Sequence, residues 1–408
     1  MRVVSIEQLK TILSGLPSNP RVVASGNFAA PTVLLKALDE SVEQFKLHML
    51  NAQPGIPDRD GVTYESAFVG PGMRRHPRLS YIPSRLSLVP VLFRDHYGPD
   101  VVLLHTSAVR NGVVSLGTEV NVVPAAIEAA RERGGLVIAQ ANPNMPFTFG
   151  DSELDEQHID YLVGVDEPLP TKPASEFTDV TRNIGERISA KITDGSTLQL
   201  GIGAIPDSVL KTLPSRKELR IWTEMFSDGV LELHQRGALA ENIPITASFV
   251  FGSTELYQWL HLNEGVRMLR TEKTNDPAQI ARQAKMTSIN AALQVDLYDQ
   301  ANASHVNGQI YSGFGGSTDF IVGALHARGG ASFMALPSWH PKANRSTIVP
   351  RLSENVTSFQ HSYVVTENGI ADCFGHSSAQ QATNLIEKAA HPSVREELRE
   401  AARGLHIL

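Results

Sequence analysis

Short apolar runs alternate with amphipathic stretches along most of the chain. The β-branched runs "DVVLLHTS", "GLVIAQ", "TLQLGIG" and "ASFMALPS" have the length and composition of buried strands. Between such runs lie stretches with helical spacing of apolar residues, for example "PAAIEAARERG" and "PDSVLKTL". This alternation predicts α/β units built around mainly parallel sheets.

The predicted pattern of strand, loop and helix occurs twice. "VVASGNFAAPTVLLKAL" covers residues 22–38 and "LQLGIGAIPDSVLKTL" covers 198–213, and aligning Gly26 with Gly201 also aligns Pro31 with Pro206. Further similar pairs follow in the same order: "NGVVSLG" with "NGQIYSG", "GLVIAQAN" with "ASFMALPS", and "DYLVGVDE" with "SYVVTENG". We therefore expect an internal duplication, giving two similar open α/β domains that face each other across a cleft.

The boundary between the two domains is expected in a proline-rich segment. "DEPLPTKPASEFTDVT", residues 166–181, contains three prolines and has no apolar period. A chain of 408 residues is also too long for a single core. We predict domains over residues 1–180 and 181–408, with the active site in the cleft between them.

Composition narrows the class of protein. The chain is 42% hydrophobic and 19% charged, which is typical of a globular enzyme. Its formal net charge of −7 argues against nucleic acid as the main partner. The single cysteine, Cys373, excludes an intramolecular disulfide framework and a multi-cysteine metal cluster. With neither a signal peptide nor an apolar run of about 18 residues, we expect a cytoplasmic protein without a membrane partner.

One acidic residue occupies an apolar setting. In "WTEMFSDGV", Glu224 lies between Trp222 and the pair Met225–Phe226, directly after the strand-like run "LRIW". The alignment of the two halves places Glu224 close to Leu50, so only the second half has an acid at this position. This asymmetry favours a functional carboxylate, although a helix cap, a surface acid or asymmetric packing is the alternative.

Two glycine-rich loops could hold an anion near this carboxylate. "LGIGAIPDSV" contains Gly201 and Gly203, and "YSGFGGSTDFIVGAL" contains Gly315 and Gly316 followed by the expected helix caps 317–319. Glycine lets backbone N–H groups approach a ligand at a helix start, although a tight turn is the simpler meaning of a lone Gly-x-Gly. Neither loop has the spacing of a dinucleotide fingerprint or a P-loop. The pattern suggests a bound oxyanion, carboxylate or pyrophosphate.

Five segments carry a resemblance to a known family. "LQLGIGAIPDSVL", "TEMFSDGV", "INAALQVDLYDQANA", "GQIYSGFGGSTDF" and "YVVTENGIADCFG" resemble, in order, motifs of the acetyl-CoA hydrolase/transferase family, most closely the 4-hydroxybutyrate CoA-transferase type of the family I CoA-transferases. The resemblance is densest over residues 190–380 and continues more weakly through "RLSLVPVLF" and "QANPNMP". It implies two open α/β domains, with the catalytic glutamate in the second.

The resemblance implies a role for individual residues. Glu224 would be the nucleophile, and the first loop would contact coenzyme A (CoA) or the acyl group through Gly201, Ile202, Gly203, Ala204 and Ile205. Gly315, Gly316 and Ser317 would supply donors to CoA or to an oxyanion, and Gln294 would lie near CoA. No metal and no tightly bound cofactor are expected, CoA being a substrate, and the chain is expected to form a homodimer.

One segment departs from the family pattern. Family members often carry "STAKGGKVSRIVP", whereas this chain reads "SWHPKANRSTIVP", which places Pro341 at the usual lysine position. The neighbouring Lys342 could still reach the CoA phosphates, and Trp339 and His340 could reshape the acyl or pantetheine channel. The acyl donor and acceptor therefore stay undefined at this stage.

Three functions remain for the structure to discriminate. The first is transfer of CoA between short-chain carboxylic acids through covalent intermediates on Glu224, a carboxylate expected to be ionised at neutral pH and to need no base. The second is hydrolysis of acyl-CoA on the same scaffold. The third is a non-catalytic module that binds CoA esters or sugar phosphates, because fold alone does not define function.

Overall fold

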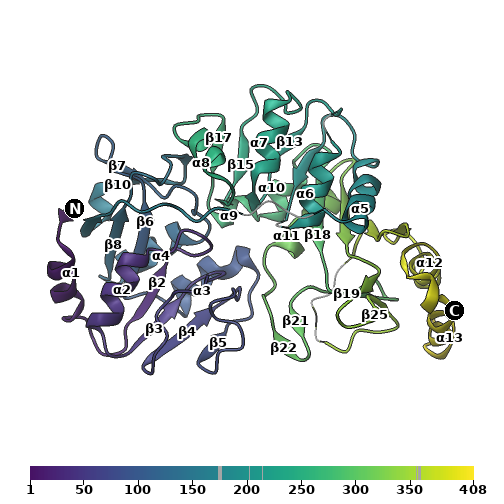
Figure 1. Ribbon diagram of the computed structural model, residues 1–408, viewed down its shortest axis with the longest axis horizontal. Helices are drawn as coiled ribbons and strands as arrows, with labels where there is room; N and C mark the ends of the chain where they lie inside the picture. The colour runs from purple at the N-terminus through teal and green to yellow at the C-terminus, as the bar shows by residue number, and fades with distance from the viewer. Residues whose placement is uncertain (173–176, 202, 214, 355, 357–359) are drawn as a thin grey trace. The chain divides into compact units, whose positions relative to one another are not determined.

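The computed structural model describes residues 1–172, 177–201, 203–213, 215–354, 356 and 360–408. The chain forms two compact units (Figure 1). The first consists of Met1–Lys172, Pro244–Thr274 and Gln309–Gly315. The second consists of Pro173–Ile243, Asn275–Gly308 and Gly316–Leu408. The long first segment ends close to the expected linker, but two later segments return to the first unit.

The first unit is built on an eight-stranded sheet in which every strand pair is parallel. The strands, in spatial order, are β1 (Arg2–Val3), β11 (Tyr161–Gly164), β8 (Leu136–Ala141), β6 (Val101–Thr106), β2 (Arg21–Ala24), β3 (Phe45–His48), β4 (Val62–Ser66) and β5 (Leu79–Tyr81). The helices are α1 (Ile6–Leu13), α2 (Thr32–Ser41), α3 (Val89–Asp95), α4 (Val123–Glu132), α8 (Thr254–Leu260) and α9 (Thr271–Thr274).

Small sheets complete the first unit. β7 (Val113–Ser115) pairs antiparallel with β10 (Glu153–Asp155), and a parallel sheet joins β15 (Ile245–Ala247), β17 (Val266–Met268) and β9 (Phe149–Gly150). Two further short strands are β16 (Phe249–Val250) and β22 (Gln309–Ile310). The β17–β9 pairing is one of the connections between the returning segment 244–274 and the first 172 residues.

The second unit has a six-stranded sheet in which only the last strand is antiparallel. Its order is β13 (Arg220–Ile221), β12 (Thr197–Gln199), β18 (Thr287–Ala291), β23 (Ala331–Ala335), β27 (Tyr363–Val365) and β28 (Ile370–Asp372). The helices are α5 (Asp179–Ser189), α6 (Ala204–Lys211), α7 (Asp228–Gln235), α10 (Pro277–Ala281), α11 (Ser317–His326), α12 (Ser378–Asn384) and α13 (Arg395–Gly404). Shorter strands are β14 (Met225–Phe226), β19 (Gln294–Asp296), β20 (Ala301–Asn302), β21 (His305–Val306), β24 (Trp339–His340), β25 (Arg345–Ser346) and β26 (Ile348–Val349).

The two main sheets share one strand order. The series β3-β2-β6-β8-β11 in the first corresponds to β13-β12-β18-β23-β27 in the second, and three of the four sequence repeats fall on corresponding strands of these series (β2 and β12, β8 and β23, β11 and β27). The Asn-Gly pairs of the repeat also share a backbone conformation, with φ of 52° and 78° at Asn111–Gly112 and of 52° and 74° at Asn307–Gly308. The predicted α/β fold with two units and mainly parallel sheets is confirmed. The shared order supports the duplication, which stays an inference.

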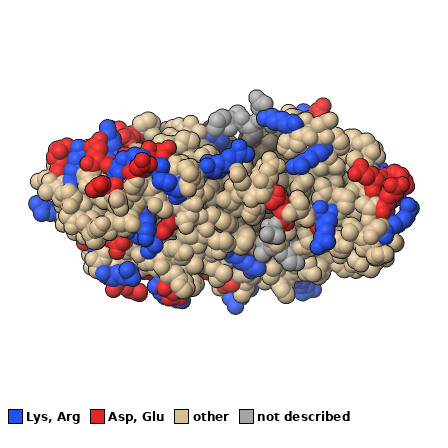
Figure 2. All heavy atoms as spheres, turned by 90° about the horizontal axis from the view of Figure 1, so that it is seen from below, with Lys and Arg blue, Asp and Glu red and all other residues tan. Residues whose placement is uncertain are grey.

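Apolar strands hold each unit together. All six residues of β6 are buried, as expected for a parallel strand whose two faces are both covered. In the second unit, strand and helix residues form a core cluster that contains the fully buried Cys373. Among the described residues, no helix is long and apolar enough to cross a membrane. Basic and acidic side chains are mixed over much of the surface seen in Figure 2.

Candidate active site

Glu224 follows the carboxyl end of the edge strand β13 in the second unit. The residue before it is fixed by hydrogen bonds, because the buried Thr223 hydroxyl accepts the Leu200 N–H at 3.1 Å and donates to the Met225 carbonyl at 2.8 Å. Leu200 directly follows β12 and precedes Gly201. The backbone at Glu224 and the start of the first glycine loop are therefore held side by side.

Two residues hold the Glu224 carboxylate. The side chain of Asn275, which is fully buried, donates from Nδ2 to Glu224 Oε2 at 2.9 Å. Gly316, the N-cap of α11, lies against the same group: a Cβ added there would lie 2.0 Å from Glu224 Oε2 and 2.1 Å from Asn275 Nδ2. The φ of Gly316 is −100°, so the close approach, not the backbone conformation, requires glycine here.

The surroundings of Glu224 favour its neutral form. Burial raises the pKa of Glu224 to about 7, the Asn275 hydrogen bond opposes the rise, and the nearby Asp319 carboxylate adds to it. Trp222, two residues earlier, packs against the apolar cluster of Ile280 and Phe320. This raised pKa differs from the expected carboxylate that is ionised at neutral pH, because an unperturbed glutamate titrates near pH 4.3.

The expected helix caps at 317–319 are also corrected. Gly316 occupies the N-cap of α11 without a side-chain cap, and Ser317–Asp319 form the first turn of the helix. Asp319 is 1% exposed, which brings its charge into the neighbourhood of Glu224 instead of the solvent. The helix therefore includes the three residues that the sequence suggested as its caps.

The first glycine loop joins β12 to α6. Gly203 is the N-cap of α6 with φ 129°, a conformation that favours glycine, and Ala204 and Ile205 form the first helical turn. Gly201 has room around it, since an added Cβ would meet no atom closer than 3.7 Å. Ile202, also predicted to contact CoA, lies outside the described residues.

A polar network that the sequence did not single out lies at the ends of β12 and β18. The buried Gln199 accepts through Oε1 from Ser288 Oγ at 2.7 Å and from Asn290 Nδ2 at 3.2 Å. The chain leaves the sheet in opposite directions from these two strands. Such a switch point, at the carboxyl ends of parallel strands, is where open α/β sheets bind ligands.

Other predicted site residues lie elsewhere. Gln294 is on β19 and lines a cavity of ≈ 250 Å³ together with His305, Arg345 and Glu354, without Glu224 among the lining residues. Lys342 is exposed in the turn between β24 and β25. Gly315, with φ 58°, packs against the ring of Phe68 within the first unit. The roles predicted for these residues stay predictions.

Asn275 is the principal residue that sequence reasoning missed. It is 51 residues from Glu224 and lies just before the N-cap of α10, Asp276, whose side chain accepts from the Ala278 N–H. The string "TNDPAQ" therefore indicates a helix start. The side-chain amide of Asn275, next to this helix start, is the feature of the sequence that could have identified Asn275 as a candidate hydrogen-bond donor.

Comparison with known proteins identifies the family that the chain resembles. Profiles described as the acetyl-CoA hydrolase/transferase N-terminal and C-terminal domains match residues 56–172 and 252–402. The succinyl-CoA:acetate/propanoyl-CoA:succinate CoA transferase of Fasciola hepatica is 36% identical over 95% of this chain and 85% of its own length. The 4-hydroxybutyrate coenzyme A transferase of Clostridium kluyveri is 35% identical over 95% of this chain and 94% of its own.

Solved structures agree with these relatives. The crystal structure of 4-hydroxybutyrate CoA-transferase from Porphyromonas gingivalis matches with a TM-score of 0.82 at 31% identity, covering 99% of this chain and 98% of that one. More distant relatives include an acetyl-CoA hydrolase of Neurospora crassa, 28% identical over 77% of this chain and 69% of its own.

The relatives and the fold define the class of enzyme. Relatives named CoA-transferases are 31–36% identical to this chain over 80–95% of its length, which confirms the prediction of a CoA-transferase enzyme. The chain belongs to the acetyl-CoA hydrolase/transferase family.

Proposed function

We propose that the protein is an acyl-CoA:carboxylate CoA-transferase that moves CoA between short-chain carboxylic acids through covalent intermediates on Glu224. The observation that carries this proposal is a partly buried carboxylate held by Asn275 against the backbone of Gly316. Acyl-CoA and carboxylates as substrates, no tightly bound cofactor, a homodimer and a cytoplasmic location belong to the same proposal.

The proposed reaction starts with attack on the thioester. A Glu224 oxygen adds to the acyl carbonyl, the C–S bond breaks, and CoA leaves as a thiolate, forming an acyl-glutamyl anhydride. The thiolate then adds to the glutamyl carbonyl and releases the first acid as a carboxylate, leaving a glutamyl-CoA thioester. An incoming carboxylate reverses these steps and leaves with CoA. No proton is gained or lost, so no general base is required.

Surroundings that raise the pKa of Glu224 suit such a nucleophile. Poor solvation destabilises the negative charge of a carboxylate, which makes the carboxylate a stronger nucleophile. Partial burial also limits the access of water to the anhydride. Backbone N–H groups at the start of α11, next to Gly316, are suited to stabilise the negative charge that forms on the acyl carbonyl oxygen during attack.

Hydrolysis is the second candidate, because some relatives are named acetyl-CoA hydrolases. It would use the same first steps, with water instead of an acid attacking the glutamyl thioester. Both activities are measured in one assay that follows free CoA and newly formed acyl-CoA, with and without an acceptor acid. Free CoA accumulating over many turnovers would favour the hydrolase, whereas acyl-CoA of the acceptor acid would favour the transferase.

The kinetics test the covalent mechanism. With acetyl-CoA and a series of acids of two to six carbons, initial rates are expected to follow a ping-pong pattern, since the first acid leaves before the acceptor enters. Double-reciprocal plots at fixed acceptor concentrations should be parallel. Converging lines, which indicate both substrates bound together, would count against a glutamyl intermediate.

The rate is expected to depend on pH through Glu224. Only the carboxylate attacks, and its pKa is raised to about 7, so kcat/KM should fall as the pH drops below 7, about tenfold per unit. An unperturbed glutamate would instead lose activity only near pH 4.3 or below. A profile of kcat/KM between pH 5 and 9 distinguishes the two cases, and a rate that stays constant down to pH 5 contradicts the raised pKa.

A further inference from the structure

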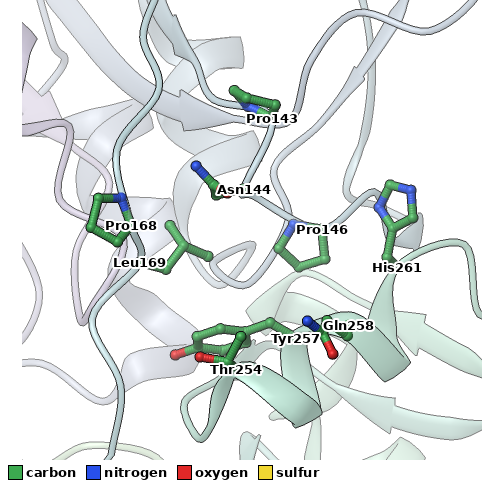
Figure 3. A pocket seen from close by; sticks show the side chains of 9 residues that line it. All are labelled: Pro143, Asn144, Pro146, Pro168, Leu169, Thr254, Tyr257, Gln258 and His261. Carbon is green, nitrogen blue, oxygen red and sulfur yellow. The ribbon is translucent and has the colours of Figure 1, made fainter.

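A cavity in the first unit lies apart from every residue assigned above. Its volume is ≈ 390 Å³, and it opens between the loop after β8, the loop after β11 and helix α8 (Figure 3). Nine residues line it: Pro143, Asn144, Pro146, Pro168, Leu169, Thr254, Tyr257, Gln258 and His261. A cavity of this size at the carboxyl ends of parallel strands has the dimensions and position of a small-molecule site.

The walls of the cavity are rigid and mostly apolar. Pro168, Leu169 and Pro146 lie above Tyr257 in Figure 3, and Pro143 lies farther from it, beyond Asn144. The Tyr257 hydroxyl donates to the Pro170 carbonyl at 2.8 Å, which fixes the ring, and the side chain is only 7% exposed. None of the nine lining residues is Asp, Glu, Lys or Arg. Such walls suit a flat, uncharged group more than an anion.

The polar groups at the rim have assigned hydrogen-bonding roles. Asn144 Nδ2 donates to Asn142 Oδ1, Asp166 Oδ1 and the Glu167 carbonyl at 3.2, 2.8 and 3.0 Å. This leaves Asn144 Oδ1 as the group able to accept from a ligand.

The other two rim groups supply donors. His261 Nδ1 accepts the Phe147 N–H at 3.2 Å, so a neutral His261 ring carries its proton on Nε2 and donates from there. The Gln258 amide is exposed, and no hydrogen bond of its side chain to another described residue is observed, so it can both donate and accept.

We propose that this cavity binds a purine base of the adenine type. An aromatic base stacks on apolar and aromatic side chains, and its edge carries both donors and acceptors. Asn144 Oδ1 would accept from the exocyclic amine, and Gln258 and His261 would donate to ring nitrogens. A hydrocarbon chain would make no use of these three groups, and a phosphate would find no Lys or Arg among the lining residues.

Two molecules could bring such a base. One is CoA itself, whose nucleotide carries adenine, and this source rests on the proposed function. The other is a free adenine nucleotide that acts as an effector. Both share the chemistry that the cavity recognises, and a competition experiment separates them.

The test compares binding of AMP and IMP by calorimetry to the full-length protein. The two nucleotides share ribose and phosphate and differ in the base, so the exocyclic amine is the main variable. AMP is expected to bind at least several-fold more tightly than IMP, and Gln258→Ala is expected to weaken AMP binding about three- to tenfold, the effect of one hydrogen bond. Glu255→Gln, on the same helix but outside the lining, is the matched control.

Competition then identifies the source of the base. Displacement of AMP by CoA assigns the cavity to the CoA adenine, and undisturbed AMP binding in saturating CoA assigns it to an effector. Equal affinity for AMP and IMP, or binding that is unchanged in both Gln258→Ala and His261→Ala, overturns the proposal. Failure of the proposed function is visible separately, as a wild-type protein that exchanges no CoA in the acid-panel assay.

Discussion

Glu224→Gln is expected to lower the rate of CoA exchange by more than about 1,000-fold, because the amide keeps the size of the side chain but removes the nucleophilic oxygen. Wild-type protein incubated with acyl-CoA alone should retain CoA on the peptide that contains Glu224, detectable by mass spectrometry. Borohydride should reduce that thioester and inactivate the enzyme, and prior addition of an acceptor acid should protect it. The Gln variant should form no adduct.

Two controls accompany this substitution. Glu224→Asp keeps the charge but withdraws it by one methylene group, and a displacement of about 1 Å can cost roughly 100-fold in rate. Thermal unfolding separates an effect on catalysis from an effect on folding. Because the pKa of Glu224 is raised in the folded protein, the folded state loses stability as the pH rises through about 7 and Glu224 becomes charged. Glu224→Gln should therefore unfold at pH 8 at a temperature no lower than wild type. Exchange by the Gln variant near the wild-type rate would show that the carboxylate is structural.

Gly316→Ala is expected to reduce kcat by roughly 100-fold, since the new methyl group would have to occupy the space of the carboxylate. Its Cβ would lie 2.0 Å from Glu224 Oε2 and 2.1 Å from Asn275 Nδ2, so one or both side chains must move. The Glu224–Asn275 hydrogen bond would then lengthen or break. The measurement is the exchange rate at saturating substrates, with circular dichroism to confirm that the variant is folded.

A second glycine supplies the matched control for this variant. Gly404, at the end of α13, also lies in the second unit, and a Cβ added there meets no atom within 4 Å. Gly404→Ala should therefore exchange CoA at the wild-type rate. If Gly316→Ala did so as well, the steric account of the glycine would be wrong.

Much of the fold could be predicted because buried parallel strands leave a local pattern. Runs such as β6 and β23 are apolar over consecutive residues, and the helices between them carry an apolar face. The return of residues 244–274 to the first unit could not be predicted, because it depends on pairings such as Arg267 with Phe149, which are set by tertiary packing. No short sequence pattern encodes a partner more than 100 residues away.

The candidate site was predictable only in part, for the same reason. Glu224 and Gly316 occur in distinctive strings, so each could be proposed from its neighbours in the sequence. The partner of Glu224, Asn275, lies in a string that indicates a helix start, and only the folded chain brings the two side chains together. The raised pKa also depends on burial and on Asp319, which the sequence suggested as a helix cap.

The chain passes back and forth between the two units, so it cannot be cut at one point into two complete units. A gene cut at the proline-rich linker would give a first half without residues 244–274 and 309–315, leaving β9 without its partner β17. The second half would carry those two segments without the rest of the first unit, and Asn275 and Gly316 are each the first residue after one of them. A cut or a fusion junction at the linker would therefore leave both products with incomplete units, so neither unit corresponds to one continuous piece of the chain.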